Sequence, residues 1–300
     1  MEAKTIGILG GGAWGTAFAQ ALARGGHKVH IWALEPEVKE SVNSEHENKR
    51  YLPHIKLSPN ITVSNDIVEV AADKELLVVA SPSLYLADTI KKITSVPNIA
   101  DGSTLVIALT KGFVPSPDGP KLILETIENI LPGIYKGNTV YVSGPSHAEE
   151  VAMSKLTGLI AASENPKNSI RAREMIKAPS LMVYSSFDVV GVQICAAAKN
   201  VIAVVYGALD AVAEHSQIFG DNAESLLLAA GLNEIQTLGM AMGATHAETF
   251  TSIAGIGDLD VTCKSKYGRN RHFGQDMIKT DILARFSDID DLLANISKIG

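Results

Sequence analysis

The chain has 300 residues, of which 46% are hydrophobic and 20% charged, and its formal net charge is −7. This length allows two domains with separate cores, and the acidic balance without a cluster of Lys and Arg argues against nucleic acid as a partner. The two cysteines, Cys195 and Cys263, lack metal-ligand spacing, so we expect buried thiols, no metal site and a reducing compartment. The first expected strand begins at Thr5, close to Met1, so we expect no signal peptide.

The beginning of the chain has the pattern of a dinucleotide-binding turn. An apolar strand is expected over residues 5–9, and Gly10, Gly12 and Gly15 follow it in the spacing Gly-x-Gly-x-x-Gly, directly before a helix. The first glycine allows a tight turn, the second lets the backbone approach the phosphates, and the third lets helix and strand pack closely. The helix N-terminus then offers unpaired N–H groups to an anion. Because glycine-rich turns also occur without any ligand, the surrounding sequence decides the interpretation.

An acidic residue after the second expected strand supports dinucleotide binding. That strand covers residues 28–34, and Glu35 stands where the fold places an acid on the ribose hydroxyls. Its carboxylate would repel a 2′-phosphate, and the neighbouring Leu34 and Pro36 supply no cation, so NAD is favoured over NADP. The alternative is a solvated glutamate at a strand end.

The remaining elements predict an α/β fold with a doubly wound, mostly parallel sheet, followed by a helical part. Further strands are expected over residues 61–63, 75–81, 104–110, 139–143, 156–161 and 181–185. Helical spacing is found over residues 192–213, 224–242, 247–253, 273–285 and 290–299. We therefore expect a dinucleotide-binding domain of the Rossmann type at 1–186 and an all-α substrate and catalytic domain at 187–300. Polar residues within 192–213 argue for a helix buried in protein rather than a membrane span.

Several polar residues and one lysine follow expected strands, at the sheet edge where open α/β sheets bind ligands. Lys111 comes directly after an apolar strand, so its cation would point into the crevice where a cofactor and an anionic substrate meet. Gly144 and Ser146 follow the strand that ends at Ser143. Ordinary loop chemistry is the alternative for each of them.

Lys199 is the sharpest catalytic candidate, because it lies in an apolar helical run where its ammonium cannot easily reach water. Burial would lower its pKa and make it a proton donor and acceptor near neutrality, whereas a lysine that snorkels to the surface is the alternative. Farther along, we expect a glycine-flanked loop at 254–262 that carries Asp258. Arg269 and Asn270 then open a helix, with donors suited to a phosphate or, alternatively, to a surface charge cluster.

Six motifs in this order resemble the NAD(P)-dependent glycerol-3-phosphate dehydrogenase family. They lie at residues 10–15, 108–112, 143–145, 198–201, 254–259 and 268–270, and residues 45–53 resemble the family's loop after the second strand. The resemblance implies a Rossmann-type sheet followed by a helical domain of the 6-phosphogluconate dehydrogenase-like type. It also implies hydride transfer between NAD(H) and a small phosphorylated substrate, interconverting dihydroxyacetone phosphate and sn-glycerol 3-phosphate for glycerophospholipid synthesis. A cytoplasmic homodimer is implied as well.

The resemblance further implies roles for single residues. Lys199 corresponds to the proton-transferring lysine, Asp258 to the acid that supports it, and Lys111 to a lysine that touches substrate and nicotinamide. Implied cofactor contacts are Gly10, Gly12, Ala13, Trp14, Gly15, Glu35, Lys111, Ala148 and Arg269. Implied substrate contacts are Lys111, Gly144, Ser146, Lys199, Asn200, Asp258, Thr262, Gly268, Arg269 and Asn270. The family continues beyond the position of Gly300 with a pair of residues that contact the nicotinamide end, so either the sequence is truncated or the protein lacks this contact and part of its helical domain.

Two other classes of function remain open. A dehydrogenase of the same architecture with another phosphorylated or hydroxyacid substrate would share the glycine turn and a buried lysine. It would not need Lys111, Asp258 and the pair of Arg269 and Asn270 together. A non-catalytic NADH-binding protein would keep its cofactor affinity and its signal after substitution of Lys199 by alanine, whereas an enzyme would lose turnover.

Overall fold

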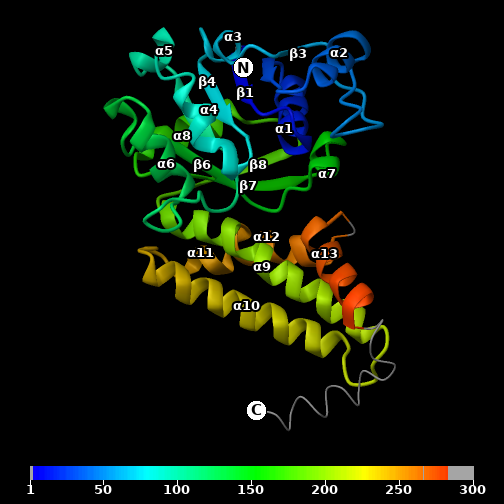
Figure 1. Cartoon of the computed structure of the whole chain (residues 1–300). Coiled ribbons are helices and arrows are strands. Elements are labelled where there is room, and N and C mark those ends of the chain that lie inside the picture. Colours follow the sequence, from blue (N-terminus) through cyan, green and yellow to red (C-terminus); the bar gives the residue numbers. More distant parts are fainter. Residues whose placement is uncertain (1–2, 266, 283–300) are drawn as a thin grey trace.

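A computed structural model describes residues 3–265 and 267–282, and eight strands form one sheet in the order β3-β2-β1-β4-β5-β6-β7-β8 (Figure 1). Their bounds are β1 Thr5–Leu9, β2 Lys28–Trp32, β3 Ile61–Ser64, β4 Leu76–Val79, β5 Leu105–Ala108, β6 Val140–Ser143, β7 Thr157–Ala162 and β8 Leu181–Ser186. The strands β1 to β6 pair in parallel, β7 is antiparallel to β6, and β8 is parallel to β7. The eight expected strands and the mostly parallel sheet are confirmed.

The sheet is buried on both faces, which explains why its central strands read as continuous apolar runs. In β4, Leu76 and Val78 belong to one hydrophobic cluster, whereas Leu77 and Val79 belong to a second one, because successive strand residues point to opposite faces. The helices of this part are α1 Ala13–Arg24, α2 Pro36–Glu45, α3 Ile67–Ala71, α4 Leu86–Lys91, α5 Pro97–Ala100, α6 Ile123–Ile130, α7 Ala148–Ala152 and α8 Pro166–Met175. The first cluster includes side chains of α1, and the second includes those of α4 and α6.

The part of the chain after β8 is helical and lies below the sheet in Figure 1. It comprises α9 Val189–Ala213, α10 Asp221–Ala241, α11 Glu248–Thr251, the π-helical turn η3 Ile253–Gly257, α12 Asp258–Lys264, α13 Arg269–Met277 and η4 Ile278–Ile282. Helix α13 packs against α9 through two glycines. A Cβ on Gly207 would come within 1.9 Å of the Arg271 carbonyl oxygen, and a Cβ on Gly274 within 2.0 Å of the Val204 carbonyl oxygen. The backbones therefore touch, and α9 fixes the place of α13.

Helix α9 is apolar and long enough that length and composition alone would allow it to cross a membrane. However, 67% of its most apolar window is buried inside the protein. Its first turn is held by Asp188, whose carboxylate accepts a hydrogen bond from the Gly191 N–H over 3.0 Å. The expectation of a buried helix here is confirmed. Cys195 on this helix and Cys263 on α12 are both buried free thiols, as expected.

The expected loop at 254–262 is wrong, because this segment is helical. The Ser252 hydroxyl accepts a hydrogen bond from the Ala254 N–H and begins η3, which runs directly into α12. Gly255 serves close packing here, since a Cβ would lie 1.9 Å from the Phe250 carbonyl oxygen. The expected helix at 290–299 and the end of the one at 273–285 lie outside the described residues.

Candidate active site

The glycine turn after β1 is shaped to receive a dinucleotide. Gly10 has a φ of 136°, and a Cβ there would meet the Ala80 backbone at 2.7 Å, while a Cβ on Gly15 would lie 2.1 Å from the Gly10 carbonyl oxygen. By contrast, a Cβ on Gly12 would meet no atom of the described chain within 4 Å. The backbone is thus tight where it turns and open where the phosphates approach. The residues present fit the pyrophosphate of a dinucleotide.

Helix α1 contributes its N-terminus to the same place. No side chain caps the helix after Gly12, and its first turn carries no acidic residue, so the N–H groups and the positive end of the helix dipole face the turn. Trp14 packs beside Phe18, with 5.6 Å between ring centroids, and Ala148 at the start of α7 packs on the same hydrophobic cluster. Ala13 begins the helix itself.

Glu35 is the N-cap residue of α2, directly before the first residue of the helix. Its Oε1 accepts a hydrogen bond of 2.6 Å from the Tyr51 hydroxyl. The sequence analysis considered only the chain neighbours of Glu35 and so missed a nearby cation. The Arg50 guanidinium lies 5.3 Å from the centre of the Tyr51 ring and forms an ion pair with Glu37.

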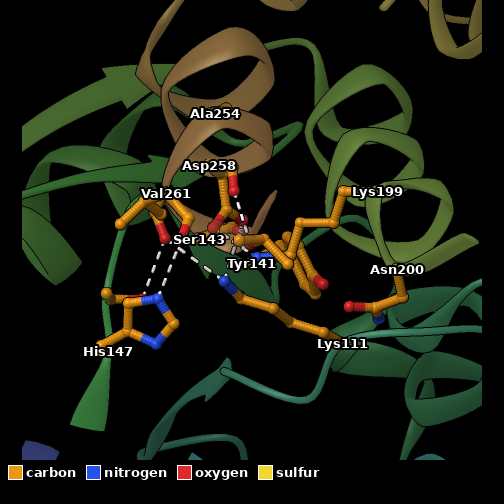
Figure 2. Close-up of polar contacts among 12 residues, drawn as sticks. Lys111, Tyr141, Ser143, His147, Lys199, Asn200, Ala254, Asp258 and Val261 are labelled. Carbon is orange, nitrogen blue, oxygen red and sulfur yellow. Dashed lines mark hydrogen bonds and ion pairs between the residues drawn. The ribbon is translucent and has the colours of Figure 1, made fainter. Parts of the chain in front are cut away.

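Three charged side chains from distant parts of the sequence meet at the carboxyl end of the sheet (Figure 2). Asp258 reaches in from α12, and its two oxygens bind different lysines. Lys199 of α9 bonds Oδ1, and Lys111, from the loop after β5, bonds Oδ2 at 2.9 Å. Asp258 is 1% exposed and Lys199 is 6% exposed. The three residues that the sequence analysis proposed as catalytic are therefore in direct contact.

Burial and charge set the protonation of this cluster. Desolvation lowers the pKa of Lys199 to about 7, and the positive charge of Lys111 acts in the same direction, while Asp258 opposes both. For Asp258, burial alone would raise the pKa, but the two ammonium groups outweigh it and hold the pKa below its ordinary value. Lys199 is thus a base and acid poised near neutrality beside a carboxylate that stays ionised.

The loop after β6 supports the lysines. Lys111 donates a second hydrogen bond, 3.2 Å long, to the Gly144 carbonyl oxygen, and the Ser146 hydroxyl donates to the same oxygen over 2.9 Å. Gly144 has a φ of 142°, and a Cβ would lie 2.5 Å from the Gly158 carbonyl oxygen, so no other residue fits. Ser143 donates a long hydrogen bond of 3.4 Å to Asp258 Oδ2.

The residues proposed to hold a phosphate lie at the start of α13, next to α9. Asn270 donates a hydrogen bond of 2.9 Å from Nδ2 to Oδ1 of Asn200, which joins the two helices beside Lys199. Gly268 precedes the first residue of α13, and Arg269 is exposed. Across residues 3–265 and 267–282 no carboxylate forms an ion pair with Arg269, so its guanidinium is available to an anion.

Thr262 and three residues that the sequence analysis did not name as site residues hold the site together. The Thr262 hydroxyl donates to the Asp258 carbonyl oxygen over 2.6 Å within α12, and a ring nitrogen of His147 lies 3.1 Å from the Val261 carbonyl oxygen, which links α12 to the loop after β6. Tyr141 is buried, which raises its pKa, and it donates over 3.0 Å to the Thr110 carbonyl oxygen. This bond anchors the backbone just before Lys111. Position in the sequence could have indicated two of these residues, because Ser143 is the last residue of an expected strand and His147 follows four residues later.

A glycine turn that opens a parallel sheet, together with a buried lysine and carboxylate at its carboxyl end, defines a dinucleotide-dependent oxidoreductase. Two family models match the chain, and the chain belongs to the NAD-dependent glycerol-3-phosphate dehydrogenase family. The model of the family's N-terminus matches residues 5–169, and that of its C-terminus matches residues 188–296.

Curated relatives and solved structures agree with this assignment. The chain is 55% identical over 301 residues to a glycerol-3-phosphate dehydrogenase [NAD(P)+] of Treponema denticola, covering 98% of this chain and 84% of the relative. It is 52% identical to the enzyme of the same name from Treponema pallidum, covering 99% and 86%. The crystal structure of a glycerol-3-phosphate dehydrogenase from Coxiella burnetii superposes with a TM-score of 0.82 at 31% identity, covering 92% of this chain and 80% of the other.

Proposed function

We propose that the protein interconverts dihydroxyacetone phosphate and sn-glycerol 3-phosphate with NAD(H), and thereby supplies glycerol 3-phosphate for glycerophospholipid synthesis. One observation carries the proposal: a single buried carboxylate, Asp258, binds both Lys111 from the sheet and Lys199 from the helical part. This cluster lies at the carboxyl end of the strands, on the same edge as the glycine turn, where a carbonyl and a nicotinamide would meet.

The chain's own residues account for the proton in this reaction. Bound nicotinamide supplies the hydride to C2 of the ketone or accepts it from the alcohol. In the reducing direction, Lys199 donates a proton from Nζ to the carbonyl oxygen as C2 gains the hydride, which leaves a neutral amine and a hydroxyl. In the reverse direction, the neutral amine of Lys199 removes the hydroxyl proton.

Lys111 and Asp258 make that proton transfer favourable. Negative charge grows on the carbonyl oxygen as the hydride arrives, and two ammonium groups fixed in a dry site stabilise it without having to reorganise. The single negative charge of Asp258 lies between the two lysines and offsets part of their mutual repulsion before the substrate binds. We assign the binding of the phosphate to Asn200, Asn270 and Arg269, so that its binding energy orients the reacting carbon.

The cofactor contacts and the remaining parts of the proposal rest on the same fold. We assign cofactor binding to the glycine turn, Ala148 and Glu35, with NAD favoured over NADP because the nearby Arg50 guanidinium is already paired with Glu37. The division into 1–186 for the cofactor and 187–300 for substrate and catalysis is supported by the gap between the last strand and α9. We infer a cytoplasmic homodimer from the resemblance to the family alone, and light scattering of the purified protein tests the dimer.

The proposal is tested by the initial loss of NADH absorbance with dihydroxyacetone phosphate. We expect turnover by the wild type, and a loss of roughly 10²- to 10⁴-fold in Lys199→Met with the NADH dissociation constant unchanged. Lys155→Met is the matched control, because Lys155 is an exposed lysine paired with Glu150 at the surface. A wild type that binds NADH but reduces only a different keto substrate would favour the related dehydrogenase, and one that turns over neither would favour the non-catalytic protein.

A further inference from the structure

The segment at residues 46–53, directly after α2, contacts both the glycine turn and Glu35. Asn48 belongs to this segment, is 0% exposed, and directs its side chain toward the glycine turn. Its Nδ2 donates one hydrogen bond of 2.8 Å to the Gly11 carbonyl oxygen and another of 2.8 Å to the Thr16 hydroxyl on α1. The Thr16 hydroxyl itself bonds the Gly11 carbonyl oxygen over 3.3 Å. Asn48 therefore fixes the backbone of the turn that receives the pyrophosphate.

Three residues farther on, the same segment reaches Glu35. The Tyr51 hydroxyl donates to Glu35 Oε1 over 2.6 Å, while the Tyr51 N–H donates to Asn48 Oδ1 over 3.1 Å. Leu52 is 1% exposed in the core of the sheet and donates its N–H to the Asn48 carbonyl oxygen over 2.9 Å. One short, anchored piece of chain thus holds both the glycine turn and the acid after β2.

The hydrogen bond from Tyr51 to Oε1 fixes the orientation of the Glu35 carboxylate, and therefore the position of its second oxygen, Oε2. Within the described part of the chain, no further hydrogen bond or ion pair engages the Glu35 side chain. Its Oε2 remains to accept from a ribose hydroxyl, and a carboxylate held in one rotamer loses less freedom when it does so. The hydrogen bond to Glu35 also raises the pKa of Tyr51, so the phenol stays a donor at neutral pH.

We propose that Asn48 and Tyr51 are positioning residues that join the two ends of the adenosine diphosphate site, and that Tyr51 makes Glu35 selective for the 2′-hydroxyl. This inference rests on the proposed role of Glu35 in favouring NAD. The nearby Arg50 explains why a restraint is needed: a Glu35 side chain released from Tyr51 can turn toward this guanidinium. A Glu35 carboxylate that is paired with Arg50 would neither bind the 2′-hydroxyl nor repel a 2′-phosphate.

The test measures the dissociation constants of NADH and NADPH by fluorescence titration of the full chain, so that turnover is not needed. We expect Tyr51→Phe to raise the dissociation constant of NADH roughly three- to tenfold, which corresponds to the loss of one hydrogen bond. The dissociation constant of NADPH should stay unchanged or fall. The ring stays in place, so packing is kept. Tyr184→Phe is the matched control, because Tyr184 is a half-exposed tyrosine on the edge strand β8. We expect this variant to keep both dissociation constants of the wild type.

Two further variants separate the inference from the proposal on which it rests. Glu35→Gln should abolish the preference for NADH, and Asn48→Asp should weaken both cofactors to a similar degree, because it sets a carboxylate against the Gly11 carbonyl oxygen. If Glu35→Gln removes the preference and Tyr51→Phe keeps it, the role of Tyr51 is refuted while that of Glu35 stands. If Glu35→Gln keeps the preference, the proposed role of Glu35 is wrong, and the inference for Tyr51 falls with it.

Discussion

Removing the shared carboxylate is the sharpest test of the active-site cluster. Asp258→Asn keeps the size of the side chain and removes the charge that both lysines face. An ion pair at the 2.9 Å of Lys111 Nζ and Asp258 Oδ2 corresponds to roughly 6 kcal/mol at an effective dielectric constant of about 20. Breaking a buried ion pair by deleting one partner costs roughly 3–5 kcal/mol of unfolding free energy, because a charge is left without a counter-charge.

The catalytic effect follows from Lys199. In the wild type, Asp258 raises the pKa of this lysine against desolvation and the charge of Lys111. Without the carboxylate, we expect the pKa of Lys199 to fall further, so that less of the ammonium needed as proton donor is present at neutral pH. We expect kcat for ketone reduction to fall by at least roughly 100-fold at pH 7 and to recover in part as the pH is lowered. The assay is the initial rate of NADH loss across the pH range.

The control lies on the same helix. Asp260→Asn removes an exposed carboxylate that pairs with Lys264 at 2.7 Å one turn away, so we expect kcat to be unchanged and unfolding free energy to shift by less than about 0.5 kcal/mol. A pH profile of Asp258→Asn with the same shape as the wild type, merely lower, would show that the carboxylate has only a structural role. The reasoning fails outright if kcat is unaffected.

Three other outcomes are expected. In the wild type, the rate of ketone reduction should fall as pH rises through the lowered pKa of Lys199, about 7, whereas the rate of alcohol oxidation should rise; profiles of both directions that rise together would contradict this. Asn270→Ala leaves Asn200 without its partner across the helices, so KM for the phosphorylated substrate should rise by roughly tenfold with kcat less affected, as steady-state kinetics will show. Gly144→Ala forces a Cβ to within 2.5 Å of the Gly158 carbonyl oxygen at a positive φ, and thermal unfolding should show a loss of at least roughly 1–3 kcal/mol.

The pH dependence of stability gives a further check on Asp258. Its pKa in the folded protein is depressed below the ordinary 3.8, so the carboxylate stabilises the fold at any pH above that value. This contribution is lost as the pH falls through the depressed pKa. Urea unfolding should therefore show the wild type more stable than Asp258→Asn at neutral pH, with the two approaching each other in strong acid. A constant difference at every pH would contradict the charge-based account.

Much of the fold follows from local patterns. The central strands β4, β5 and β6 were predictable because each is a short, fully buried run rich in apolar residues, and the outer strands β2 and β8 because they are short and rich in apolar or β-branched residues. The order of β7 and β8 and their reversed direction were not predictable, since these depend on how α7 and α8 pack rather than on strand composition. The segment at 254–262 was taken as a loop because glycine usually marks one, whereas there it allows a close helical turn.

In the candidate site, too, some features follow from local sequence and others depend on tertiary packing. Lys199 stood out because an ammonium in an apolar helix has a large desolvation penalty that only a function explains well. Its contact with Lys111 through Asp258 could not be predicted from spacing, because the three residues lie on elements that only tertiary packing brings together. Arg50 and Tyr51 were missed beside Glu35 for the same reason: charge was judged along the chain, whereas it acts through space.

The arrangement of the site also explains why its charges are shared between the two parts of the chain. Lys111 is anchored to the sheet through Gly144, Lys199 is carried by α9, and among residues 3–265 and 267–282 Asp258 on α12 is the carboxylate that pairs with both. When a substrate carbonyl lies between the two lysines, their ammonium groups take the place of the water molecules that the carbonyl oxygen has lost. Both ion pairs depend on where α12 lies between α9 and the sheet. Proton-transfer chemistry in this protein is therefore coupled to the packing of its helical part on the sheet.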